Sequence, residues 1–152
     1  MSICTFFGHK NAPEQAEKFL LTILIDLIEN KNVDMFYVGN NGSFDNMVIK
    51  NLKILKLDYP HIKYAIVIAY MPNEKAESRY DDLNYTIYPE GLENTPPKYA
   101  IVKRNRWMIN MSEYVVVYVK HSFGGAAQFK ELAEKKGKIV INLADSKALK
   151  CK

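Results

Sequence analysis

Residues 114–119 read Tyr-Val-Val-Val-Tyr-Val, residues 124–127 read Gly-Gly-Ala-Ala, and the amphipathic stretch Gln128–Lys136 follows directly. The apolar run predicts a buried strand, and the amphipathic stretch predicts a helix. A strand, a turn of small residues and a helix in this order are typical of phosphate sites in α/β proteins. Small residues let the backbone approach an anion, and a helix N-terminus offers N–H donors. Because many such turns serve only tight-turn geometry, the other turns of the chain must be considered with this one.

Strand-like and helix-like segments alternate along the whole chain. Further apolar runs predict strands at Ile3–Phe7, Met35–Val38, Tyr64–Tyr70, Tyr85–Tyr88 and Lys138–Asn142. The 3.6-residue period predicts helices from Pro13 to about Asn30, from an N-cap at Ser43 through Leu55, at Lys98–Met111 and at Gln128–Lys136. Met71–Pro97 is a long excursion with one brief strand, and Ala144–Lys152 is a tail. We therefore expect a single α/β, Rossmann-like domain over residues 1–152, with a mainly parallel sheet and helices on both faces.

Composition and charge bound the function. The chain has 152 residues, of which 48% are hydrophobic and 25% charged, and its net charge of +4 includes no block of five or more like charges. No basic stripe is interleaved with aromatic residues, so we interpret the basic residues as solvated helix faces and expect no nucleic-acid partner. Cys4 and Cys151 fit neither a disulfide framework nor a metal site, and no leader or membrane span is evident. These features indicate a reduced, cytoplasmic protein without a membrane partner, a metal or a cofactor.

Right-handed crossovers place every strand-to-helix turn at the carboxyl edge of a parallel sheet, where open α/β sheets bind their ligands. The candidate ligand-binding residues therefore form one predicted site: Gly8, His9, Lys10, Gly39, Gly42, Asp45, Arg104, His121, Gly124, Gly125 and Ala126. His9 and His121 have no second ligand three or four residues away, which argues against metal binding.

Three charged residues of this site have two interpretations each. Arg104 lies on the apolar stripe of its predicted helix, where a guanidinium needs an anionic partner. That partner is either a bound phosphate or carboxylate, or an internal acid such as Asp45 or Glu131. Asp45 either accepts hydrogen bonds from a ribose or complements a helix dipole. Glu131 either faces a ligand held at Gly124-Gly125 or is an ordinary surface residue.

Four segments in order resemble the SLOG superfamily, a Rossmann-like nucleotide-binding group that includes the LOG phosphoribohydrolases and a bacterial branch of small uncharacterised proteins. The segments are Thr5–Lys10, Phe36–Asp45, Arg104–Met108 with Ser112-Glu113, and Gly124–Glu131. The resemblance implies that Arg104 and Glu131 match positions implicated in cleaving an N-glycosidic bond, and that Gly124 and Gly125 match the phosphate-binding turn. The chain departs from the LOG signature where Ala127 and Gln128 replace glycine and threonine.

From these features we expect the chain to bind a nucleotide or a nucleotide-derived small molecule, in a sensing or regulatory role. One alternative is an N-ribosyl hydrolase or transferase, in which Glu131 stabilises an oxocarbenium-like centre or activates water and Arg104 orients the phosphate. Another is a protein-interaction module that keeps the fold without a ligand. The resemblance, with aromatic residues such as Tyr80, Tyr85 and Tyr88, also favours a homo-oligomer.

Overall fold

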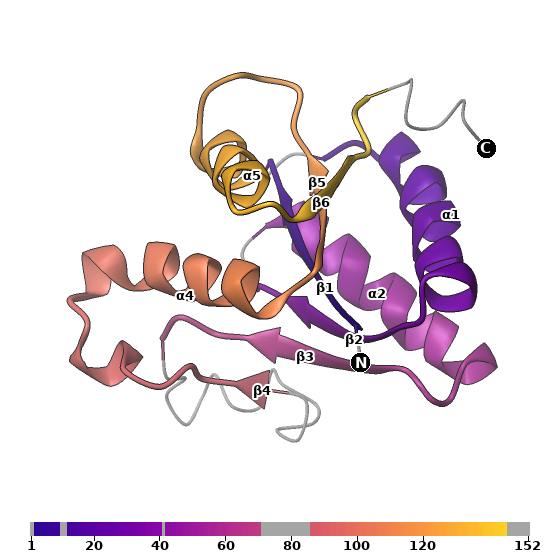
Figure 1. Ribbon diagram of the computed structural model, residues 1–152, viewed down its shortest axis with the longest axis horizontal. Coiled ribbons are helices and arrows are strands. Elements are labelled where there is room, and N and C mark those ends of the chain that lie inside the picture. The colour runs from indigo at the N-terminus through magenta and orange to yellow at the C-terminus, as the bar shows by residue number, and fades with distance from the viewer. Residues whose placement is uncertain (1, 10–11, 41, 71–85, 146–152) are drawn as a thin grey trace.

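A computed structural model of the chain describes residues 2–9, 12–40, 42–70 and 86–145. In this part of the chain one parallel sheet forms, with the strand order β4-β3-β2-β1-β5-β6 (Figure 1). Its strands are β1 (Ser2–Gly8), β2 (Val33–Val38), β3 (Lys63–Val67), β4 (Thr86–Ile87), β5 (Tyr114–Tyr118) and β6 (Ile139–Asn142). The prediction of an α/β, Rossmann-like fold is confirmed.

Helices cover both faces of this sheet. They are α1 (Gln15–Asn30), α2 (Ser43–Asp58), α4 (Pro97–Met111) and α5 (Gly125–Lys135), with a 3-10 turn η2 at Leu92–Asn94. In Figure 1 the helices α1 and α2 lie on one side of the strands, and α4 and α5 lie on the other. No helix among the described residues is long and apolar enough to span a membrane.

The strands divide their side chains between two cores, because successive side chains point to opposite faces of a sheet. Phe6 and Phe36 are buried against α1 and α2, whereas their neighbours Phe7 and Tyr37 are buried against α4 and α5. Each large apolar side chain that is fully buried contributes about 1.5–3 kcal/mol. This burial determines which side chains of each strand face which pair of helices. It therefore also determines the face of the sheet toward which each strand-to-helix turn leads.

Several predicted boundaries differ from the structure. Helix α5 begins at Gly125, three residues before the predicted start at Gln128, so the small-residue turn already belongs to the helix. Strand β3 ends at Val67 rather than at Tyr70. Ser43 is not the N-cap: Gly42 occupies that position with φ 115°, and the Ser43 Oγ accepts a hydrogen bond from the Ala12 N–H over 3.1 Å.

Parts of some predictions lie outside the described residues. These are Lys10, residues 71–85 of the long excursion with Tyr80 and Tyr85, and residues 146–152 of the tail. The rest of the excursion forms β4 and η2, and Tyr88 is half-buried against Leu92 and Ala100. The single domain over residues 1–152 stays a prediction.

The strand order reverses beside β1. From β1 the chain proceeds outward through β2, β3 and β4, then returns to the other side of β1 with β5 and continues to β6. The crossovers on the two sides of β1 therefore run in opposite directions. In open α/β sheets such a reversal leaves a crevice at the carboxyl ends of the strands, and the candidate site lies there.

Candidate functional site

A cleft of about 360 Å³ opens at the carboxyl end of β1, between α4 and α5. Its lining includes seven of the predicted site residues: Gly8, His9, Gly39, Asp45, Arg104, Gly125 and Ala126. Gly42, His121 and Gly124 lie outside this lining. The fold thus brings together residues from four strand-to-helix segments that are up to about a hundred positions apart in the sequence.

Arg104 lies deep in this cleft, with only 3% of its surface exposed. Its Nη1 donates hydrogen bonds to the Val67 carbonyl oxygen over 2.9 Å and to the Asn40 Oδ1 over 3.1 Å. Its Nε donates to the Asn105 Oδ1 over 2.7 Å. Burial lowers the pKa of the guanidinium from its ordinary value, whereas the nearby charge of Asp45 raises it. These contacts fix a buried positive charge at the switch point of the sheet.

Asp45 is the acidic neighbour of this arginine and is itself buried. The side chains of Asp45 and Arg104 both pack against Gly39, the residue that follows β2. A Cβ added to Gly39 would lie 3.0 Å from the Asp45 Oδ2 and 3.2 Å from the Arg104 Nη1. Gly39 therefore makes room for the pair. This arrangement supports the internal-acid interpretation of Arg104 with Asp45 as the acid, and it also leaves Arg104 in the wall of the cleft.

The turn before α5 places backbone N–H groups at the mouth of the cleft. Gly124 is the N-cap of α5 with φ 98°, a conformation that favours glycine, and Gly125 and Ala126 form the first turn. The first N–H groups of a helix have no partner within the helix, and the helix dipole adds positive potential to them. Apart from its chain neighbours and the backbone of α5, no atom of the described residues lies within 4 Å of a Cβ built on Gly124 or Gly125, so this turn has room for a ligand.

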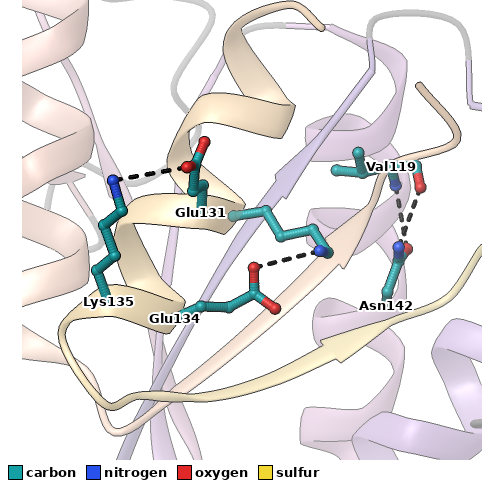
Figure 2. Close-up of polar contacts among 6 residues, drawn as sticks. Val119, Glu131, Glu134, Lys135 and Asn142 are labelled. Carbon is teal, nitrogen blue, oxygen red and sulfur yellow. Dashed lines mark hydrogen bonds and ion pairs between the residues drawn. The ribbon is translucent and has the colours of Figure 1, made fainter. Parts of the chain in front are cut away.

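Glu131, which the enzyme alternative assigns to stabilising an oxocarbenium-like centre or activating water, lies outside this cleft. It is exposed on α5 and its Oε1 is 3.5 Å from the Nζ of Lys135, toward which it points in Figure 2. It is not among the residues that line the cleft with Arg104. Phe129 lines the cleft, and position 131 lies two residues further along α5, about 200° around the helix axis, so Glu131 faces the other side of the helix.

Sequence reasoning assigned no role to two residues that hold the guanidinium of Arg104. These are Asn40 and Asn105, whose Oδ1 atoms accept its hydrogen bonds. The pair Asn40-Asn41 between two glycines was a usable signal for a polar turn. No sequence pattern predicts the hydrogen bond between the side chains of Asn105 and Arg104. Neighbouring helical residues point about 100° apart, so contact between their side chains depends on the rotamers.

The fold is Rossmann-like, and its cleft lies at the carboxyl edge of the sheet. The structure is similar to DNA processing protein A (DprA) from Streptococcus pneumoniae, with a TM-score of 0.65, 19% identity and coverage of 93% of this chain and 50% of that one. It is also similar to DprA from Helicobacter pylori, whose structure is described for its single-stranded DNA binding mode, with a TM-score of 0.64, 15% identity and coverage of 93% and 64%.

The chain thus spans between half and just under two thirds of these DprA structures. No family model and no curated protein matches the sequence. At these identities the likeness concerns the fold, and it agrees with the SLOG resemblance at that level.

The comparison corrects the functional expectations. DprA is a DNA-processing protein, and the Helicobacter structure concerns single-stranded DNA. This finding contradicts the predicted small nucleotide ligand with a sensing role, and neither the N-ribosyl hydrolase nor the ligand-free interaction module fits it. The expectation that no nucleic acid binds is contradicted as well. The physical reason is that the test for a basic stripe was applied along the sequence, and cations contributed by separate segments of a fold leave no such stripe.

Proposed function

We propose that this chain binds single-stranded nucleic acid along the carboxyl edge of its sheet. The observation that carries the proposal is the buried guanidinium of Arg104 in the cleft at the switch point, beside the open N-terminal turn of α5. A phosphate at this turn would accept backbone N–H hydrogen bonds and lie near the fixed positive charge. The likeness to DprA supports nucleic acid as the source of that phosphate.

Exposed cations on the same edge support a polymeric ligand over a single nucleotide. Lys98 lies in the first turn of α4, Lys103 reaches the Gly91 carbonyl oxygen, and Lys120 follows β5. All three belong to segments that start or end at the carboxyl edge. A strand that passes the cleft would place further phosphates within reach of these side chains, and affinity would then depend strongly on salt.

Fluorescence anisotropy with a labelled oligothymidine of about 16 nucleotides, the upper end of common single-strand site sizes, tests the proposal. We expect saturable binding that weakens as salt rises. Lys120→Ala is expected to reduce the salt slope by about one unit. Lys53→Ala, which removes an exposed lysine from the middle of α2, is the matched control and is expected to leave the slope unchanged. Absence of saturable binding at low salt would contradict the proposal.

A further inference from the structure

Three rings stand in series at the lip of the cleft. The ring centroids of His9 and His121 are 5.0 Å apart with an interplanar angle of 38°, and those of His121 and Phe123 are 5.1 Å apart at 18°. At the inner end, the edge of His9 meets Tyr118 of β5. At the outer end, Phe123 exposes 71% of its surface. An aromatic ring so exposed is not there to fill a core, because His121 covers it on one side only.

Backbone hydrogen bonds from two strand ends hold this series in place. The His9 N–H donates to the Tyr118 carbonyl oxygen over 3.2 Å. The His9 Nε2 in turn accepts hydrogen bonds from the N–H groups of Lys120 over 3.0 Å and His121 over 3.4 Å. The loop after β5 is thus fastened to the end of β1 as far as His121, and the Phe123 ring stacks on the His121 ring. A ring that is ordered before binding loses little conformational entropy when it binds.

We infer that Phe123, backed by His121 and His9, is a stacking platform for an unpaired nucleobase. The inference rests on the proposed function and names the part of the ligand that this ring receives. Because Phe123 directly precedes the Gly124 turn, a base on the ring and the phosphate at the N-terminus of α5 can belong to adjoining units of one strand. Every base has a flat face, so such a platform accepts any sequence.

Such a platform would make the protein bind single-stranded nucleic acid in preference to a duplex. In a duplex each base is stacked and paired within the helix, so its face is unavailable to a protein ring unless the base is flipped out. A single strand presents its bases at little cost. We therefore expect the cleft and the lysines to provide affinity for phosphates, and Phe123 to provide the preference for unpaired bases.

Three ligands and three protein variants test this inference by anisotropy. The ligands are oligothymidine, an abasic strand of the same length, and a duplex, which is expected to bind more weakly than oligothymidine. Phe123→Ala is expected to weaken oligothymidine binding about tenfold or more, and to leave binding of the abasic strand unchanged. Phe123→Tyr keeps the ring and is expected to restore binding. Phe19→Ala, on the outer face of α1, removes a ring that is 40% exposed and serves as the control.

The outcomes separate the two proposals. If the wild-type protein binds neither oligothymidine nor the abasic strand, the proposed function fails. If it binds both strands equally well and Phe123→Ala changes neither affinity, nucleic-acid binding stands and the platform is refuted. A circular dichroism spectrum and an unfolding curve for each variant exclude loss of the fold as the cause.

Discussion

Substitution of Gly39 by alanine tests the packing of the cleft. The new Cβ would lie 3.0 Å from the Asp45 Oδ2, 3.2 Å from the Arg104 Nη1 and 3.3 Å from the Arg104 Cζ, all closer than ordinary van der Waals contact. Arg104 cannot withdraw freely, because its Nη1 is bonded to the Val67 carbonyl oxygen. Overpacking of this kind costs about 1–3 kcal/mol, and the reduced freedom of the unfolded chain returns about 0.4–1 kcal/mol.

The net destabilisation of Gly39→Ala is therefore about 1–2 kcal/mol, which corresponds to a decrease of roughly 2–8 °C in Tm for a domain of this size. Urea denaturation and thermal unfolding measure it. Gly125→Ala is the matched control, since its added methyl group meets no atom of another described element within 4 Å and its φ is not positive. Equal unfolding free energies for the two variants would refute the crowding of Asp45 and Arg104 against β2.

Three further outcomes are expected. Arg104→Met removes the buried guanidinium beside the Asp45 carboxylate and should lower the unfolding free energy by about 3–5 kcal/mol. Adding Asp45→Asn should recover part of this loss, and strict additivity in urea denaturation would argue against coupling between the two residues. Burial and the charge of His121 lower the pKa of His9, whose ring also lies beside Tyr118 and the backbone N–H of Lys120, so the fold favours neutral His9. Stability should therefore fall as pH drops below about 6.5, and His9→Gln, which accepts hydrogen bonds without titrating, should lack this part of the loss in unfolding curves between about pH 5 and pH 8. Glu131→Gln removes only an exposed ion pair with Lys135, so the unfolding free energy should stay nearly unchanged and the affinity for oligothymidine should change less than twofold. A larger loss of affinity would indicate that Glu131 belongs to the site.

The fold could be predicted from the sequence because its signals are local. Runs such as 114–119 are apolar without interruption, as strands buried on both faces must be, and the helices between them show a clear 3.6-residue period. The errors fall at element ends. The predicted start of α5 at Gln128 missed a helical turn, because Gly125 and Ala126 carry no amphipathic signal, although Gly124 supplies the positive φ that begins the helix.

The site could be predicted only in part. Topology alone places Gly8, Gly39 and Arg104 at one edge, and the cleft contains them. The partners of Arg104 depend on side-chain rotamers, and the ring series of His9, His121 and Phe123 joins positions more than a hundred residues apart. Neither kind of contact has a sequence period, and for the same reason the cations of the edge did not stand out as a nucleic-acid signature.

The two cores of the sheet are unequal, and this has a consequence for hydrogen exchange. The cluster beneath α1 and α2 contains the larger share of the fully buried side chains, whereas the cluster beneath α4 and α5 is smaller and adjoins the open cleft. Amide protons of α4 and α5 should therefore exchange through partial opening at lower free energy than those of α1 and α2. A nucleic-acid strand bound across α4 and α5 would slow exchange in these two helices and not in α1 and α2. The pattern of protected amides would therefore show which face of the sheet holds the ligand.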